Sequence, residues 1–203
     1  MLPPNWRGLT GFSNFEVLLL DEGLALAWVP PRDILQLLFD APTQQDRRKI
    51  LGRRWKRVVG ACRESIESVS GSDLAEYRRF ALNVVAMLEG GHPEGAQALA
   101  ANLLDTMLRE TLDRLDHRLV TDQRTRFLID DLPLRAAVVF GGIWGSHTEF
   151  WASRGDAIPR GYTRHASAHG VSRLQYSRIN AVIALTHVTA YLMLLESDGK
   201  FED

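Results

Sequence analysis

The feature that most constrains the fold is the apolar segment at 181–195, close to the C-terminal end of the chain. It predicts a helix from about Ser177 to Glu196 whose apolar side chains cover nearly the whole circumference. A helix that is apolar all round has to be buried. We therefore expect it at the centre of a bundle or in a dimer interface. Its polar interruptions make it too short and too polar for a membrane span.

The segments before residue 177 repeat apolar residues at helical rather than strand spacing, and none shows the alternation of several β-strands. The short apolar stretch at 15–20 fits either a helix or a strand. The sequence therefore predicts an all-α bundle of six to eight helices. Apolar stripes and capping residues predict helices over about 32–40, 43–69, 73–89, 93–115 and 134–151, with a polar link at about 115–126.

Length and composition leave two domain organisations open. Residues 1–203 can form one continuous domain, or residues 1–70 can form an N-terminal helical extension that precedes a bundle over 71–203. Hydrophobic residues make up 45% of the chain, enough for a substantial core, and the net charge of −1 does not by itself indicate a nucleic-acid partner. The single cysteine, Cys62, excludes an internal disulfide and fits a reducing compartment. Without a signal-peptide pattern at the N-terminus, we expect a cytoplasmic protein with no membrane association.

The segment at 161–170 reads Gly-Tyr-Thr-Arg-His-Ala-Ser-Ala-His-Gly and carries one arginine and two histidines. Pro159, just before it, suits the first turn of a helix. Gly170 suits the left-handed conformation that commonly follows the end of a helix. The segment therefore predicts a short helix that runs from about Pro159 to His169.

Arg164, His165 and His169 are the chemically active residues of this predicted helix. At 100° per residue, about 40° separates His165 from His169, so both lie on one face. Arg164 is about 140° from His169, but its long side chain can reach the same point. An imidazole transfers protons near neutral pH, and a guanidinium binds phosphate oxygens. Together these groups are what the metal-free cleavage of a phosphodiester needs.

Two other interpretations of the same residues remain open. Two histidines four residues apart on one helix face can bind a metal, with a third ligand such as His147 or Glu149. The zincin pattern requires a glutamate after the first histidine, however, and Ala166 stands there. In the remaining interpretation, which is purely structural, Arg164 bridges two helices and the histidines cap backbone carbonyls.

The pattern Arg164-x4-His169, with the polar His165 directly after the arginine, resembles the signature of the HEPN superfamily (higher eukaryotes and prokaryotes nucleotide-binding). The sequence Gln-Tyr-Ser-Arg-Ile-Asn-Ala at 175–181, which leads into the apolar helix, resembles the bacterial branch of that superfamily. The resemblance covers about 159–196, and the rest of the chain is similar only in being helical. It implies a HEPN-like helical bundle.

HEPN proteins of this kind are often metal-independent ribonucleases of toxin–antitoxin, abortive-infection or CRISPR-linked defence systems. For this chain the resemblance implies that Arg164 stabilises the phosphate, that His169 acts as general base or acid, and that His165 orients the site. It also implies an RNA substrate, no metal or other cofactor, and a homodimer that brings two motifs together. A separately encoded antitoxin or regulator is a further implied partner. The alternative is a non-catalytic HEPN-like module that binds a nucleotide or a protein.

A run of basic residues lies on the helix predicted over 43–69. Between residues 47 and 63 the sequence has eight basic residues and no acidic one, and Trp55 lies inside the run. Such a stretch can bind an RNA backbone while the aromatic ring stacks on a base. A solvated helix face beside acidic neighbours is the favoured alternative, because glutamates follow directly after the run. The candidate RNA-binding residues are Arg53, Arg54, Lys56 and Arg57.

Three glycines, Gly141, Gly142 and Gly145, interrupt the strongly apolar segment at 134–151. Glycine in a helix costs about 1 kcal/mol relative to alanine. The pattern therefore predicts either close packing of another backbone or a break in the helix. It does not fit a phosphate-binding loop, because the spacing and the lysine are missing.

Histidines outside the motif have simpler interpretations. His187, in the apolar C-terminal helix, is expected to be a hydrogen-bonded core residue. His147 is expected on the surface of a helix, and His92 on the surface of a turn.

Overall fold

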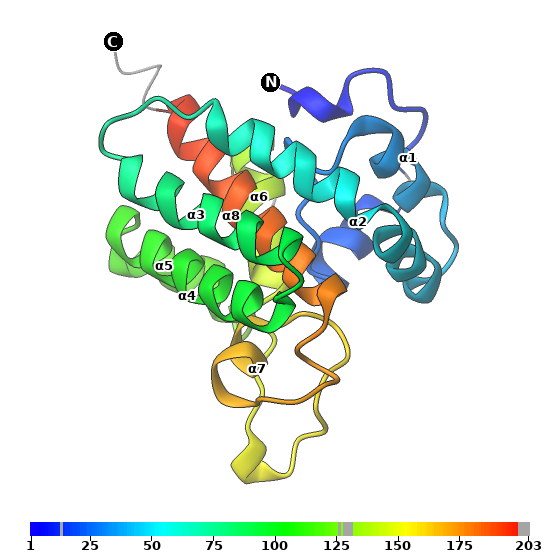
Figure 1. Cartoon of the computed structure of the whole chain (residues 1–203), viewed down its shortest axis with the longest axis vertical. Coiled ribbons are helices and arrows are strands. Elements are labelled where there is room, and N and C mark those ends of the chain that lie inside the picture. Colours follow the sequence, from blue (N-terminus) through cyan, green and yellow to red (C-terminus); the bar gives the residue numbers. More distant parts are fainter. Residues whose placement is uncertain (13, 126, 128–131, 199–203) are drawn as a thin grey trace.

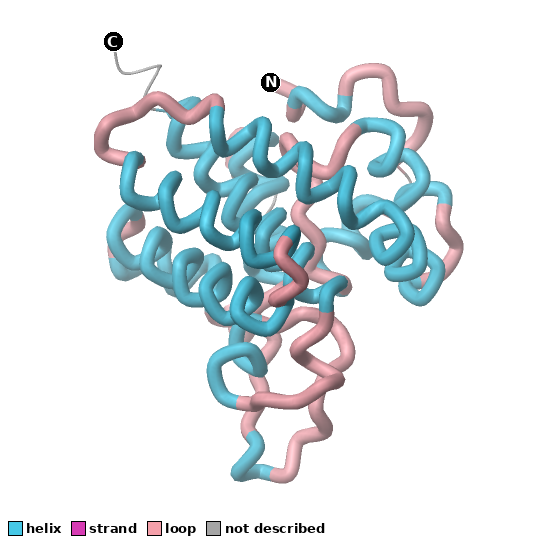
Figure 2. The backbone as a smooth tube through the Cα atoms, in the orientation of Figure 1, coloured by secondary structure: helices cyan, strands magenta, loops and turns pink. Residues whose placement is uncertain are grey.

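The computed structural model describes residues 1–12, 14–125, 127 and 132–198. Within these ranges the chain is helical and contains no strand (Figure 2), which confirms the prediction of an all-α protein. Short turns of 3-10 or π-helix are η1 (Pro4–Trp6), η2 (Val17–Asp21) and η4 (Ala152–Arg154). The α-helices in chain order are α1 (Arg32–Asp40), α2 (Gln44–Glu67), α3 (Ala75–Glu89), α4 (Pro93–Thr111), α5 (Arg114–Thr121), α6 (Leu134–Gly145), α7 (Arg164–His169) and α8 (Arg178–Asp198).

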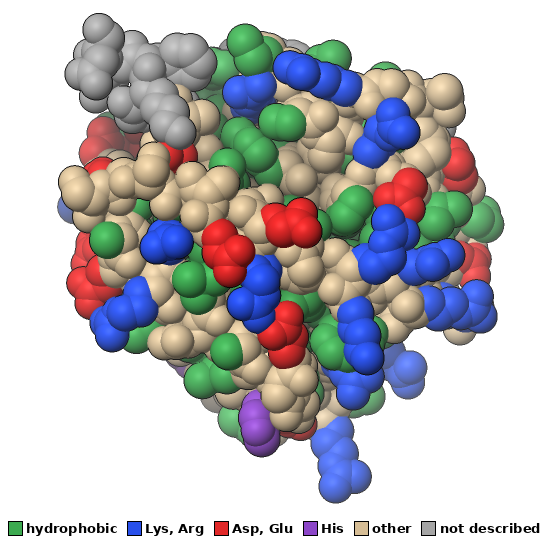
Figure 3. Space-filling model, turned by 45° about the horizontal axis from the view of Figure 1, so that its top comes forward, with side chains coloured by type: hydrophobic (Ala, Val, Ile, Leu, Met, Phe, Trp, Pro, Cys, Tyr) green, Lys and Arg blue, Asp and Glu red, His purple; other side chains and the backbone are tan. Residues whose placement is uncertain are grey.

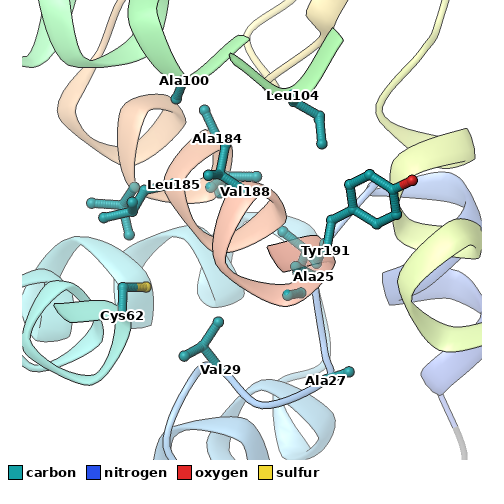
Figure 4. Packing of buried hydrophobic residues seen from close by; sticks show 14 of the residues in the cluster. Ala25, Ala27, Val29, Cys62, Ala100, Leu104, Ala184, Leu185, Val188 and Tyr191 are labelled. Atoms are coloured by element: carbon teal, nitrogen blue, oxygen red, sulfur yellow. The ribbon is translucent and has the colours of Figure 1, made fainter. Parts of the chain in front are cut away.

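Helix α8 runs through the middle of the molecule, and α2, α3, α4 and α6 pack around it (Figure 1). The close view places Ala184 and Val188 of α8 between Ala100 and Leu104 of α4 on one side and the segment at 25–29 on the other (Figure 4). These residues are buried, as an all-round apolar helix requires. The expectation of a buried helix at the bundle centre is therefore confirmed.

Helix α8 has nearly the predicted bounds, but its length and composition are those of a possible membrane span. By length and composition, the 20 residues Arg178–Ser197 would suffice to cross a membrane, with a mean hydropathy of 1.5. The interpretation as too short and too polar was wrong, because it considered only the apolar stretch at 181–195, whereas the window Arg178–Ser197 also includes the flanking residues of the helix. Of this window, 83% is buried inside the protein, as in the core helix of a bundle.

Three polar residues of α8 form hydrogen bonds to backbone carbonyls inside the core. The hydroxyl groups of Thr186 and Thr189 donate to backbone carbonyls one turn earlier in the helix, at 2.7 and 2.8 Å. His187 Nε2 donates to the carbonyl oxygen of Gly23 at 2.8 Å. Burial lowers the pKa of His187 to about 4, so the ring is neutral at pH 7. The prediction of a hydrogen-bonded core histidine is confirmed.

Helix α2 belongs to the same hydrophobic core as the helices that follow it. Its buried apolar residues, such as Val58 and Cys62, lie in one cluster with residues of α3, α4 and α8. A buried ion pair between Arg47 of α2 and Glu22 also ties the N-terminal segment to α2. A boundary at residue 70 therefore does not divide the core, which fits the alternative of one continuous domain.

The three glycines of α6 allow the segment around η2 to approach its backbone closely. A Cβ atom on Gly142 would lie 2.6 Å from the carbonyl oxygen of Leu24, and one on Gly145 would lie 2.4 Å from that of Leu19. The helix also ends at Gly145, well before the expected residue 151. Both predicted outcomes, close packing and a break, therefore occur together. This contact fixes the position of residues 146 and 147, which belong to the candidate site.

Candidate functional site

Helix α7 lies with its flanking loops at one end of the molecule (Figure 1). It begins at Arg164 rather than near Pro159, so the prediction of a helix over 159–169 was too long. The cause is the side chain of Gln175, whose Nε2 donates to the carbonyl oxygens of Pro159 and Gly161 at 3.1 and 2.9 Å. These carbonyls are therefore satisfied outside a helix. Thr163 then caps α7 by accepting a hydrogen bond from the amide of residue 166 at 2.9 Å.

Gly170 follows α7 but does not adopt the predicted left-handed conformation. Its φ is −145° and its ψ is 89°. The glycine is needed for packing instead, because a Cβ atom there would lie 2.7 Å from Cε1 of Phe150. The position of Gly170 at the helix end was predicted correctly, but the physical reason for it was wrong.

A buried network of polar side chains holds α7 on α4. Gln97 of α4 donates from Nε2 to Oγ of Ser167 at 2.8 Å and to Oε1 of Gln175 at 3.1 Å. Ser167 Oγ in turn donates to the carbonyl oxygen of Thr163 at 2.8 Å. These four residues are buried. These hydrogen bonds join α4, α7 and the loop after α7, and they hold α7 in a fixed orientation on the bundle.

His165 and His169 lie on one face of α7, as predicted, with ring centroids 5.3 Å apart. The ring of Trp151 lies 5.5 Å from that of His165. His169 is exposed, whereas His165 is partly buried. Burial lowers the pKa of His165, and the charges of His169 and Arg164 lower it further. His165 is therefore neutral near pH 7 and has a nitrogen that can accept a proton.

The guanidinium of Arg164 is turned toward α4. Its Nη2 lies 2.9 Å from Oδ2 of Asp105, and the two side chains are only 17% and 18% exposed. Arg109, one turn further along α4, donates from Nε to the same oxygen at 2.9 Å. The sequence analysis expected the guanidinium of Arg164 to reach the same point as the two histidines, but in the structure it contacts Asp105 instead. This ion pair is instead the helix-bridging role that the sequence had left open.

The charges around Arg164 sum to a positive value. Burial alone would raise the pKa of Asp105, but the hydrogen bond from Arg109 and the charges of both arginines outweigh it and lower that pKa. Burial, together with the charges of Arg109 and Arg164, also lowers the pKa of the neighbouring His117. At pH 7 two guanidinium groups thus share one carboxylate, which leaves one positive charge in excess. Asp105 and Arg109 had a signal in the sequence, because an acid four residues before an arginine forms a helix-face pair.

His147 is not the helix-surface residue that the sequence predicted. It lies beyond the end of α6, is 4% exposed, and its Nδ1 contacts the carbonyl oxygen of Ile143 at 2.7 Å. Burial lowers its pKa to about 4. The reason for the error is that the helix ends early, at Gly145, so that His147 turns inward. His92 is exposed at the start of α4, as predicted.

A metal site would need a third ligand beside His165 and His169. Among the residues that the structure describes, no group of three histidine, cysteine or acidic side chains is placed to hold a metal ion. Glu149, one candidate ligand, instead accepts a hydrogen bond from the indole of Trp151 at 3.2 Å. The other candidate, His147, is buried as described above.

The basic residues of α2 separate into two groups. Arg57, one of the candidate RNA-binding residues, forms a bidentate ion pair with Asp33 of α1 at 2.8 and 3.0 Å. This acid, close in space but distant in sequence, was not considered in the prediction. Of the other candidates, Arg53, Arg54 and Lys56 are exposed. The basic residues of α2 that pair with acids, as the favoured alternative predicted, are Arg47 with Glu22, Lys49 with Asp46, Arg57 with Asp33, and Arg63 with Glu67 and Glu89.

No protein-family model, no curated protein and no solved structure matches this chain. The class that the fold defines is therefore a broad one, an all-α bundle with a short helix of arginine and histidines at one end. The resemblance to the HEPN superfamily rests on the motif residues alone.

Proposed function

We propose that this chain is a HEPN-type, metal-independent endoribonuclease that acts as a toxin or in anti-phage defence. The observation that supports this most is the pair of histidine rings 5.3 Å apart, on the helix that also carries Arg164. Of these rings, one is exposed and the other is held neutral near pH 7 by burial. The exposed ring, that of His169, is accessible for proton transfer to and from a substrate, and the partly buried ring of His165 beside it can orient the site.

In the proposed reaction, His169 and Arg164 act on an RNA phosphodiester. A general base takes the proton of the ribose 2′-hydroxyl, and the 2′-oxygen forms a bond to the adjacent phosphorus. The bond from phosphorus to the 5′-oxygen breaks, and a general acid gives that oxygen a proton. The products are a cyclic phosphate and a 5′-hydroxyl. Arg164 stabilises the charge on the phosphate, and His165 orients the site.

Base and acid are two groups, and we propose that two copies of the chain supply them across a two-fold axis. Each copy would contribute one α7, so that one His169 side chain acts as the general base and the other as the general acid. Apolar side chains beside α7 support this arrangement because they are exposed to solvent in the single chain. Val171 is 90% exposed, Leu174 49% and Trp151 37%. A two-fold contact at this end would cover them.

The ion pair between Arg164 and Asp105 favours a second candidate function. A guanidinium that is held by a carboxylate serves a structural role, and the protein would then be a non-catalytic HEPN-like module that binds a nucleotide or a protein. Thermal stabilisation of the protein by a nucleotide, without turnover of RNA, would support that function. In either case we expect a cytoplasmic protein, and the ribonuclease would have a separately encoded antitoxin or regulator.

Cleavage of total RNA in the presence of EDTA tests the proposal. We expect wild-type protein to cleave and the His169→Ala and Arg164→Ala variants to lose at least about 100-fold in rate. His92→Ala is the matched control, because it removes an exposed histidine in the turn before α4. Circular dichroism and light scattering establish that each variant keeps its fold and dimer. Retained cleavage in both motif variants would refute the assigned roles, and an inactive wild type, with or without added Mg²⁺, would favour the binding module.

A further inference from the structure

A hollow of about 640 Å³ lies between the N-terminal part of α2 and the loop that precedes α7. We call it the basic groove, because its charged lining residues are Arg48, Lys49, Arg53 and Arg160, and no acidic residue of the described chain lines it. In the space-filling view, Lys and Arg side chains gather on the right, the side on which the N-terminal half of α2 lies in Figure 1 (Figure 3). The groove is therefore a local concentration of positive charge on a protein of net charge −1.

Most of the charge in the basic groove lacks an internal counterion. Lys49 pairs with Asp46 at 3.0 Å, but within the described residues Arg48, Arg53 and Arg160 form no ion pair. Both terminal nitrogens of Arg48 donate to the amide oxygen Oδ1 of Asn180 at 3.0 Å. That acceptor is neutral. Burial lowers the pKa of Arg48, although the charge of Glu22, which is already paired with Arg47, opposes the shift. A partly buried guanidinium with a neutral partner is stabilised when an anion binds beside it.

The charge of the groove contrasts with the charge elsewhere on α2. Arg57 and Arg63, further along the helix, are neutralised by acids of α1 and α3. The three arginines of the groove are not neutralised by acids in this way, although two of them, Arg48 and Arg53, lie on the same helix. The excess charge is therefore localised to one place rather than spread over a basic helix face.

The groove is joined structurally to the motif helix. Asn180, which orients Arg48, donates from Nδ2 to the carbonyl oxygens of Arg160 and Gln175 at 3.1 and 2.6 Å. Arg160 comes four residues before Arg164, so their Cα atoms are at most about 15 Å apart. A single strand that lies in the groove can therefore continue to α7.

An aromatic side chain follows the groove on α2. Trp55 lies between Arg53 and Lys56, and the guanidinium of Arg178 sits 4.9 Å from its ring. Cationic grooves with neighbouring aromatic rings bind single-stranded nucleic acids, because the cations contact phosphates while unpaired bases stack. A small phosphorylated metabolite would use the arginines but not the adjacent ring.

We propose that the basic groove binds backbone phosphates of single-stranded RNA beside the bond that α7 cleaves, with Arg48, Arg53 and Arg160 as the phosphate ligands. The choice of RNA as the strand rests on the proposed function, but the binding of a phosphodiester backbone does not. Arginine suits this role because its planar group donates two parallel hydrogen bonds to a phosphate. Of the four RNA-binding candidates named from the sequence, the proposal keeps Arg53 and drops Arg57, which pairs with Asp33. Arg48 belongs to the predicted basic run but was not among those four, and Arg160 lies outside the run.

Fluorescence anisotropy with a labelled oligouridine whose riboses are 2′-O-methylated tests the proposal. This strand lacks the attacking hydroxyl, so binding is measured without cleavage. The test variant is Arg53→Ala with Arg160→Ala, two exposed residues whose removal leaves the core intact. The control is Arg57→Ala with Arg79→Ala, which removes the same charge from two exposed arginines that already pair with Asp33 and Glu76.

We expect the groove variant to bind at least about tenfold more weakly than wild type, since each lost contact is a charge-assisted hydrogen bond. The slope of log affinity against log salt should fall by about 1.4, or about 0.7 for each phosphate contact. The control should change binding by less than about twofold, because its charges are already compensated. Equal losses in both variants, unchanged binding in the groove variant, or no binding by wild type would each overturn the proposal.

Two further measurements separate this proposal from others. Displacement of the strand by inorganic tripolyphosphate at concentrations below the Kd of the strand would assign the groove to a small phosphorylated ligand and overturn the RNA assignment. Cleavage separates the groove from the catalytic proposal. If the strand binds through the groove but natural RNA is not cleaved, the ribonuclease fails and the groove stands. If long RNA is cleaved equally well by wild type and the groove variant, the groove fails and the ribonuclease stands.

Discussion

Substituting Gly145 by alanine tests whether the close contact between α6 and η2 holds the site in place. A Cβ atom at this position would lie 2.4 Å from the carbonyl oxygen of Leu19 and 2.7 Å from that of Leu20. Real Cβ contacts essentially never fall below 3.0 Å, so one backbone has to move by at least 0.6 Å. Neither atom belongs to a flexible side chain that can turn away. The next residue, Ser146, would move too, and its carbonyl oxygen accepts the amide hydrogen bond of Arg164 at 2.9 Å.

The size of the effect follows from two opposing terms. Overpacking a well-packed core costs about 1–3 kcal/mol, and contact with rigid backbone places Gly145→Ala toward the upper end. Alanine regains up to about 1 kcal/mol of helix propensity, but less than that at the last residue of α6. We therefore expect a net loss of about 2 kcal/mol in the free energy of unfolding, which for a chain of this length lowers the Tm by about 4–8 °C.

The matched control is Gly60→Ala in α2, where a Cβ atom would meet nothing within 4 Å. This glycine lies inside a helix and has no packing reason to be there, so alanine should stabilise the protein by about 0.5–1 kcal/mol. Urea unfolding followed by circular dichroism measures both variants. Opposite signs support the reasoning. If Gly145→Ala has the same free energy of unfolding as Gly60→Ala, the backbone of η2 is not in close contact with the end of α6.

Two further predictions concern pH. Burial lowers the pKa of His147 and His187 to about 4 in the folded protein. Below about pH 6.5 these histidines therefore bind protons in the unfolded chain but not in the folded one. Each should reduce the free energy of unfolding by up to about 1.4 kcal/mol per pH unit as the pH falls toward 4. Urea midpoints between pH 7 and 4 measure this slope, which His187→Gln should reduce; an unchanged slope would contradict the assignment. The pKa of Asp105 is lowered, so its carboxylate stabilises the folded state above its ordinary pKa near 3.9 and the stabilisation is lost as the pH falls below it. Asp105→Asn should therefore cost about 1–3 kcal/mol at pH 7 and progressively less as the pH falls below about 3.9, and a cost that does not decrease with pH would show that the ion pairs are not its source.

The sequence was sufficient to predict the core of the fold because the core depends on local patterns. The all-round apolar α8 has to be buried wherever it lies in the chain. The capping of α2 by Thr43 also depends only on a near neighbour, because the amide of Asp46 donates to Oγ1 of Thr43 at 3.2 Å. The glycines of α6 likewise predicted a close approach without indicating which segment approaches.

The details of the site could not be predicted in this way because its contacts join distant segments. Arg164 pairs with Asp105, which is 59 residues earlier in the chain, and no local pattern connects the two. The start of α7 depends on carbonyls that Gln175 satisfies from beyond the helix. His147 turns inward because η2 ends α6 early. In each case the local sequence predicted the residue type and its neighbourhood, and a contact from elsewhere decided its orientation.

The arrangement around Asp105 bears on whether Arg164 can leave its ion pair to bind a phosphate. A buried carboxylate that loses its only partner is strongly destabilised, which would make such a movement costly. Here the same oxygen, Oδ2, accepts a hydrogen bond from Arg109 and also forms the ion pair with Arg164, at 2.9 Å in each case. When Arg164 turns to a phosphate, Arg109 still neutralises Asp105, and the guanidinium exchanges one anion for another. The ion pair that argues for a structural role in the single chain is therefore also compatible with a catalytic arginine that is held in place until its substrate arrives.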